Sequence, residues 1–131
     1  MLFKHQIKTN SREEMIDITN YIKESIKNSK ISDGIAVIYV PHTTAGLTIN
    51  ENADPSVKKD ILKFLKEKIP KNYNFSHLEG NSDAHIKSSL FGSSLTVIIS
   101  HGKPLLGTWQ GIYFCEFDGP RNRTFYVKIM E

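Results

Sequence analysis

Two histidines, two carboxylates and an amide fall within nine residues of the chain, in the segment His77–His85. No hydrophobic repeat of period 2 or 3.6 runs through this segment, so packing alone does not explain its composition. Loops with so many titratable groups are typical of binding and catalytic sites, because a rigid scaffold can hold them in place. Two further polar segments, Pro41–Gly46 and Asp118–Arg121, each follow an apolar run. We expect the three segments to converge on one site.

Three histidines in these segments, His42, His77 and His85, are candidate metal ligands. Neutral imidazole is a common zinc ligand, and three histidines that leave one position open form a catalytic arrangement. Their spacing matches no compact motif such as HExxH, so a hydrogen-bonded or surface histidine is an equally good interpretation. The predicted cofactor is a divalent ion, either zinc-like or Mg²⁺, and three imidazoles suit the zinc-like ion better.

Asp83 and Glu51 are the candidate catalytic carboxylates. Asp83 lies two residues before His85, where it could be a metal ligand, a group that orients a histidine, or a general base. The alternative is a helix N-cap over the residues that follow it. Glu51 follows the His42 segment, and its role stays open.

Arg121 is the best candidate for binding an anion and for assisting catalysis. It follows Gly119-Pro120, a rigid turn that would aim its planar guanidinium group at a phosphate or carboxylate. The alternative is an ordinary ion pair with Asp118 or Glu116. Several other side chains could add hydrogen-bond donors for a phosphate: Lys103, Thr43, Thr44, Asn81, Ser88 and Ser89.

Composition limits the class of protein. A chain of 131 residues with 24% charged residues and a net charge of +3 is typical of one globular domain. The lysines are scattered along predicted helices, which favours a solvated surface over a nucleic-acid interface. The single cysteine, Cys115, sits in an apolar run and is expected to be a buried hydrophobic residue. With no signal peptide and no membrane-spanning segment, we expect a cytoplasmic protein without a membrane partner.

Hydrophobic periodicity predicts an α+β fold. Ser11 and Glu14 form a capping box, which predicts a helix from there to about Asn28. Asp54-Pro55 predicts the start of a second helix, bounded by Pro70. The continuous β-branched run 35–40 predicts a strand that is buried on both faces. Further strands are expected at 2–9, 47–49, 93–100, 111–117 and 123–130, with a turn of helix at 84–90. The sum is a two-layer sandwich with a largely antiparallel sheet of about six strands and two main helices.

Three stretches that together span most of the chain resemble the motif blocks of the YjbQ family: PHTTAGLTINENADP, HLEGNSDAHIKSSLFGSS and GKPLLGTWQGIYFCEFDGPRNR. The resemblance implies a single YjbQ-like domain over residues 1–131, assembly as a homotrimer, and sites near the subunit boundaries. This family of uncharacterised proteins is often labelled a secondary thiamine-phosphate synthase. That label implies the joining of a pyrimidine methyl diphosphate to a thiazole phosphate, which needs a divalent ion and cationic donors for the leaving diphosphate.

Two hypotheses follow. In the first, the chain is a metal-assisted enzyme that acts on a phosphorylated small molecule, with no nucleic-acid or membrane partner. In the second, it is a trimeric ligand- or metal-binding protein without turnover. A purely structural role, with the histidines hydrogen-bonded in a subunit interface, is a third interpretation.

Overall fold

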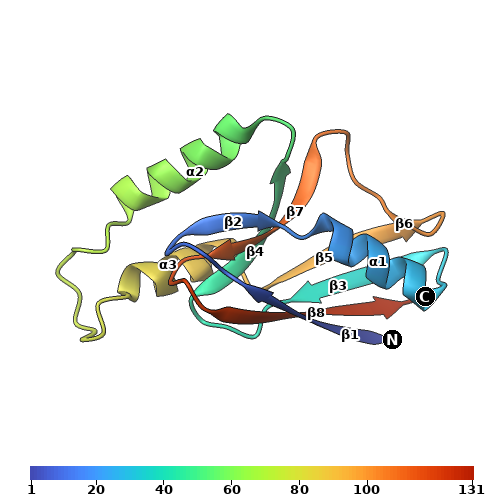
Figure 1. Cartoon of the computed structure of the whole chain (residues 1–131), viewed down its shortest axis with the longest axis horizontal. Coiled ribbons are helices and arrows are strands. Elements are labelled where there is room, and N and C mark those ends of the chain that lie inside the picture. The colour runs from blue at the N-terminus through green and yellow to red at the C-terminus, as the bar shows by residue number, and fades with distance from the viewer.

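The computed structural model describes residues 1–131 and contains three helices and eight strands. A five-stranded sheet has the order β1-β8-β3-β5-β6, and a three-stranded sheet has the order β2-β7-β4 (Figure 1). All strand pairs are antiparallel. The elements in chain order are β1 (Leu2–Lys8), β2 (Glu14–Asp17), α1 (Thr19–Ser29), β3 (Gly34–Tyr39), β4 (Ala45–Glu51), α2 (Pro55–Lys68), α3 (Ser82–Phe91), β5 (Ser94–Ser100), β6 (Lys103–Pro104), β7 (Gln110–Glu116) and β8 (Asn122–Met130). The expected α+β class and antiparallel pairing are confirmed, with eight strands in two sheets rather than about six in one.

The main core lies between the five-stranded sheet, α1 and the three-stranded sheet. It contains 15 buried residues, and β7 contributes Ile112 and Phe114 to it. The neighbouring side chains of β7, Tyr113 and Cys115, belong to a second core beneath α2 and α3. Strand β7 is therefore buried on both faces, and Cys115 is the buried hydrophobic residue that its sequence context predicts. Burial raises the pKa of its thiol, so the group is inert as a nucleophile.

The start of the first helix differs from the sequence prediction. Residues Glu14–Asp17 form strand β2, and α1 begins only at Thr19. The Glu14 carboxylate does accept the backbone N–H of Ser11 at 2.7 Å, as a capping box requires. The chain after it pairs with β7, where Met15 lies opposite Cys115, because pairing there buries Met15 in the second core. The local hydrogen bond formed as expected, but it closes a turn before a strand.

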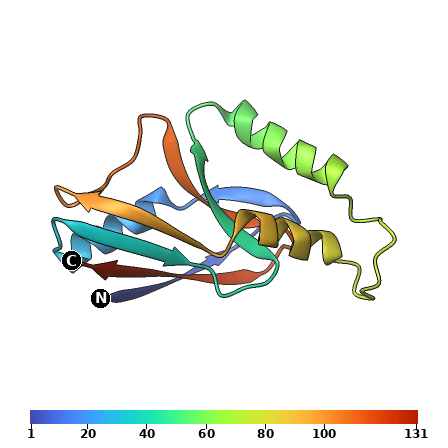
Figure 2. The same ribbon diagram turned by 180° about the vertical axis from the view of Figure 1, so that it is seen from behind.

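Helices α2 and α3 lie outside the three-stranded sheet (Figures 1 and 2). The Asp54 carboxylate accepts the N–H of Ser56 at 2.9 Å, which confirms the predicted cap before α2. Helix α3 is longer than the single turn expected, and Asn81 rather than Asp83 occupies its N-cap position. The interpretation of Asp83 as a cap is therefore wrong. None of the helices is long and apolar enough to cross a membrane.

The outer face of the five-stranded sheet is uncovered and carries several exposed apolar side chains. Along β3, Ala36 and Ile38 are fully buried, whereas Ile35 and Tyr39 are 36% and 46% exposed. On the adjacent strand β5, Ile98 is 56% exposed. The prediction that the run 35–40 is buried on both faces is therefore wrong for one chain, because no layer of the chain itself covers this side.

Candidate functional site

The three polar segments lie at one end of the molecule, where α3 meets the β3–β4 and β7–β8 turns (Figures 1 and 2). The Asn81 side chain donates to the Asp118 carboxylate at 2.9 Å, which joins the segment before α3 to the β7–β8 turn. From within α3, the Ser88 hydroxyl donates to the carbonyl oxygen of Ala45 at 2.7 Å. A Cβ atom on Gly46 would lie 2.9 Å from the carbonyl oxygen of Gly92, so only glycine allows β4 to pass this close to α3. The expected convergence of the segments is observed.

Asp83 lies in a buried network of charges beneath this site. Its carboxylate accepts two hydrogen bonds from the Arg12 guanidinium, both 3.0 Å long, and one from the Lys87 amine at 2.9 Å. Lys87 is fully buried, and it also donates to Glu13 at 2.9 Å. Burial pushes the pKa of Asp83 upward, but the hydrogen bonds and charges of Arg12 and Lys87 outweigh this and keep the pKa below its usual value. A carboxylate held in this way fixes α3 in place and is a poor general base.

A second buried ion pair holds the other two segments. The Arg123 guanidinium is paired with the Glu116 carboxylate and also donates to the Thr44 hydroxyl at 2.9 Å. The Thr9 hydroxyl donates to Glu116 at 2.7 Å. Burial raises the pKa of Glu116, but the hydrogen bonds from Arg123 and Thr9 outweigh it, so the pKa is lowered and the carboxylate is charged. Thr44, predicted to bind phosphate, is thus buried in the scaffold.

His42 is also part of the scaffold. Its Nε2 atom accepts the backbone N–H of Thr124 at 2.9 Å, which assigns the proton of the neutral ring to Nδ1. Partial burial, and then the charge of Arg123, lower the pKa of this imidazole below its usual value. The neutral ring therefore ties the β3–β4 turn to the start of β8.

Of the three candidate metal ligands, His77 and His85 are the ones whose imidazole rings line open hollows. Their ring centroids are 5.6 Å apart in an edge-to-face arrangement, and His77 Nε2 lies 3.9 Å from a Glu79 oxygen. His85 is half-buried and lines two adjoining hollows. One hollow, of about 460 Å³, also has His77 and Phe75 in its wall. The other, of about 520 Å³, has a wall without any hydrophobic residue: Thr43, His85, Ser88, Ser89, Gly92 and Ser93. We call these two hollows together the His85 site.

The three predicted metal ligands do not meet within the chain. No group of three or more His, Cys, Asp or Glu side chains is close enough to hold a metal ion. Nε2 of His42 is already an acceptor, and Asp83 is saturated by cations. His77 and His85 could supply two ligands, and any further ligand would come from outside this chain. The divalent ion stays a prediction.

Arg121 forms the ion pair that was the alternative to anion binding. Its guanidinium lies 3.1 Å from the Asp118 carboxylate, and its side chain is 51% exposed. Because part of the group still faces solvent, the ion pair leaves donors free for a ligand. Glu51 lies at the opposite end of β4 from the converging segments, about 20 Å away by strand geometry, and its carboxylate accepts the N–H of Ala53. The structure does not bring Glu51 to the His85 site of the same chain.

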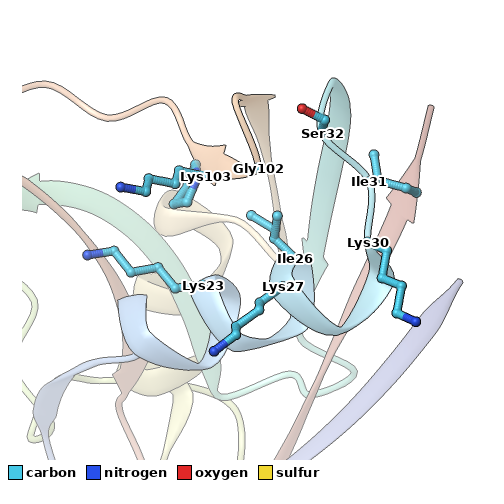
Figure 3. A pocket seen from close by; sticks show the side chains of 9 residues that line it. Lys23, Ile26, Lys27, Lys30, Ile31, Ser32, Gly102 and Lys103 are labelled. Carbon is cyan, nitrogen blue, oxygen red and sulfur yellow. The ribbon is translucent and has the colours of Figure 1, made fainter.

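Lys103 lies far from the His85 site, at the opposite end of the molecule. It belongs to β6 and lines a separate hollow of about 610 Å³ with Lys23, Lys27 and Lys30 of the α1 end (Figure 3). We call this the α1 hollow. The prediction that Lys103 donates to the same phosphate as Arg121 therefore fails within one chain.

Sequence reasoning missed the cations that hold the site together, Arg12, Lys87 and Arg123. The spacing of Lys87, four residues after Asp83, predicts that the two side chains pair on one face of a helix, as they do. No comparable spacing predicts the pairing of Arg12, because it lies 71 residues from its partner. The sequence analysis considered Arg121, rather than Arg123, as the ion-pair partner of Glu116.

Comparison with known proteins gives one consistent result. The family model for UPF0047 YjbQ-like proteins matches residues 3–131. A UPF0047 protein of Methanocaldococcus jannaschii is 75% identical over 130 residues, which cover 99% of this chain and 94% of that protein. The UPF0047 protein YugU of Bacillus subtilis is 56% identical, with 99% of each chain covered. An uncharacterised YjbQ/UPF0047 crystal structure from Clostridium acetobutylicum superposes with a TM-score of 0.96 at 56% identity, covering 98% of this chain and 99% of the other. A YjbQ-like protein of unknown function from Sulfolobus solfataricus gives a TM-score of 0.94 at 31% identity, with 98% and 95% covered.

Proposed function

The chain belongs to the YjbQ family of UPF0047 proteins, and we propose that it is an enzyme that acts on a phosphorylated small molecule at the His85 site. The reaction we propose is the one implied by the family label, in which a pyrimidine methyl diphosphate is joined to a thiazole phosphate. The carbon–oxygen bond to the diphosphate breaks, the thiazole nitrogen forms the new bond to that carbon, and the diphosphate leaves with the electron pair.

The observation that supports the proposal is the polar wall of the His85 site. The hydroxyl groups of Thr43 and Ser93 line one hollow of this site together with His85, and no apolar side chain does. Hydroxyl donors and a protonated imidazole stabilise negative charge that develops on a leaving phosphate oxygen. Phe75 in the adjoining hollow would offer an aromatic surface to a heterocycle. A divalent ion, if bound there, would neutralise further charge on the diphosphate.

We also propose that the enzyme assembles as a homotrimer through the outer face of the five-stranded sheet. Strand β3 has the continuous apolar sequence of a strand covered on both sides, yet Ile35 and Tyr39 remain exposed in the single chain. Leu2 on the edge strand β1 and Ile98 on β5 extend this apolar surface, and they are 59% and 56% exposed. Large apolar patches of this kind are typical of interfaces, and a second copy would bury them.

The catalytic proposal is tested with the purified full chain, by measuring thiamine phosphate formed from the two phosphorylated precursors. We expect His85→Gln to lower the rate by a factor of about 100, the usual contribution of an acid–base group, with no change in assembly. The matched control is His101→Asn, which changes an exposed histidine in a left-handed turn that asparagine tolerates. Equal rates in wild type and His85→Gln would contradict the proposal.

The trimer is tested by light scattering. We expect a mass of three times the 14.9 kDa chain, and a fall to one chain in the variant Tyr39→Glu, which places a charge in the proposed interface. Phe64→Glu is the control, because Phe64 is 59% exposed on α2, away from that sheet face. A monomeric wild type, or a trimer that survives Tyr39→Glu, would overturn the proposed interface.

A second candidate function is ligand binding without turnover. The observation that favours it is that Asp83, the carboxylate nearest to His85 in sequence, is occupied by Arg12 and Lys87. Under this alternative the precursors bind but no product forms, and His85→Gln lowers the affinity measured by calorimetry.

A further inference from the structure

A strongly basic cleft separates α2 from the turn that precedes β2. Its volume is about 710 Å³, within the range of roughly 300–1,000 Å³ that small-molecule sites occupy. Its lining contains one carboxylate, that of Glu13, and five cations: Arg12, Lys59, Lys63, Lys66 and Lys71. We call this the α2 cleft.

The sequence of α2 places its lysines along the cleft. The apolar side chains Ile61, Leu62 and Leu65 pack on the second core, which fixes the rotation of the helix about its axis. Lys59, Lys63 and Lys66 recur at steps of four and three residues, so they share the flank that faces the turn. None of the three is in an ion pair in the structure. Their like charges lie along one flank of the helix, and an anion bound between them would relieve their mutual repulsion.

The other wall of the cleft is a guanidinium group that is fixed in position. Arg12 donates two hydrogen bonds of 3.0 Å to Asp83, which is fully buried, and one of 3.1 Å to Glu13. Its side chain is 28% exposed and lines the cleft. Arginine with a fixed plane binds phosphate at a lower entropic cost than a free side chain does.

The α1 hollow is a useful contrast, because it is lined by four lysines and no carboxylate. Figure 3 shows the amine of Lys30 pointing away from those of Lys23 and Lys103. Lys27 and Lys30 lie at the end of α1, where the helix presents its carbonyl groups. Cations at a helix C-terminus are stabilised by these carbonyls, and an anion there is disfavoured. Helix-end carbonyls thus account for Lys27 and Lys30 of the α1 hollow and for Lys66 of the α2 cleft, but not for Lys59 and Lys63, which lie in the middle of α2.

We propose that the α2 cleft binds a small polyanion that carries at least two linked phosphate groups. Four lysines exceed what one phosphate group can neutralise, and the lysine row along α2 matches an extended anion that also reaches Arg12. The site is separate from the His85 site and does not depend on the proposed function.

Calorimetric titration of the wild-type protein with inorganic diphosphate at low ionic strength tests the proposal. We expect diphosphate binding in the α2 cleft that the double variant Lys59→Gln/Lys63→Gln weakens by a factor of about ten or more, with turnover at the His85 site unchanged. The matched control is Lys23→Gln/Lys27→Gln, which removes two exposed lysines at the same helical spacing in the α1 hollow. We expect this control to alter the affinity by less than about twofold, since its charges lie outside the cleft.

Three outcomes would overturn the proposal. One is a wild type that binds diphosphate no better than monophosphate. Another is an equal loss of affinity in the two double variants, which would indicate a general effect of surface charge. The third is a single-stranded oligonucleotide that binds more tightly with increasing length and is released by Lys59→Gln/Lys63→Gln, since the ligand would then be a nucleic acid. His85→Gln distinguishes the two sites, because it should lower turnover about 100-fold and leave binding in the α2 cleft intact.

Discussion

The converging end of the molecule contains two kinds of polar group that differ in burial. Asp83, Lys87, Glu116 and Arg123 are each at most 3% exposed and are paired with opposite charges. His85 and the hydroxyls around it reach the surface and line open hollows. The buried groups lie on the same segments as the exposed ones, within a few residues along the chain.

This difference indicates a division of roles. Removing a charge from water costs several kcal/mol, so buried ion pairs persist only when their geometry is well satisfied. Here the Asp83 network fixes α3 to the turn before β2, and the Glu116–Arg123 pair ties the β7–β8 turn to Thr44. Both leave His85 as a group that is free to meet a ligand. Substitutions of the buried groups and of the exposed groups test this division of roles.

The largest effect is expected from breaking the buried network. Asp83→Ala leaves the fully buried Lys87 with only Glu13 as partner and removes both hydrogen bonds to Arg12. We expect the free energy of unfolding to fall by about 3–5 kcal/mol, as for other buried pairs that lose one partner. Urea denaturation followed by circular dichroism measures this loss. The control Asp60→Ala removes an exposed carboxylate from α2 and should change stability by less than about 0.5 kcal/mol.

A double-mutant cycle shows whether the cost comes from unpaired charge. Because Lys87→Met removes the stranded amine, Asp83→Asn combined with Lys87→Met should cost less than the sum of the single variants. Strict additivity would mean that the two groups do not act as a pair.

The sequence predicted those parts of the fold that depend on local patterns. Ile22 and Ile26 of the first predicted helix do face the core from α1, and Asp54 does cap α2. The predicted start of the first helix was wrong, because the hydrogen bond that Glu14 accepts is also compatible with a turn that leads into a strand. Only the partner strand β7, about a hundred residues away, decides between them. The prediction that β3 is buried on both faces failed for a similar reason. An apolar pattern indicates that both faces favour burial, but it does not show whether the same chain or another chain covers them.

The candidate site was predictable in its location and less so in its chemistry. The density of polar groups in His77–His85 identified the segment, and the turn residues after β3 and β7 identified its neighbours. The roles of individual groups depended on partners distant in sequence, such as Thr124 for His42 and Arg12 for Asp83. Residue types alone do not separate a charge that holds a fold from one that faces a ligand.

An intermediate effect is expected from His42, which is half-buried. Its pKa in the folded protein lies below the usual 6.5, so the unfolded chain binds its proton first as pH falls. The stability contributed by the neutral ring is therefore complete above pH 6.5 and is lost as pH falls through the folded pKa. His42→Gln keeps an acceptor for the Thr124 N–H and removes the titration, so thermal unfolding should depend less on pH below 6.5 than in the wild type. His5, Asp83 and Glu116, whose pKa values are also lowered in the folded protein, account for the pH dependence of stability that remains. An unchanged pH profile would show that His42 is not the group involved.

The smallest effect is expected from Arg121, and the residue two positions later makes the test sharp. Arg121 is 51% exposed and pairs with Asp118, whereas Arg123 is 3% exposed and pairs with Glu116. Exposed ion pairs contribute at most about 1 kcal/mol, and salt screens them. Arg121→Ala should therefore change the free energy of unfolding by about 1 kcal/mol or less, while Arg123→Ala strands a buried carboxylate and costs several times more. Arg121→Ala should weaken substrate binding more than Arg123→Ala does, because of the two guanidinium groups only that of Arg121 has donors that face solvent. A rise in KM in Arg121→Ala without loss of stability would place this guanidinium with the ligand-facing groups, and equal destabilisation by both variants would remove the distinction between the two kinds of charge.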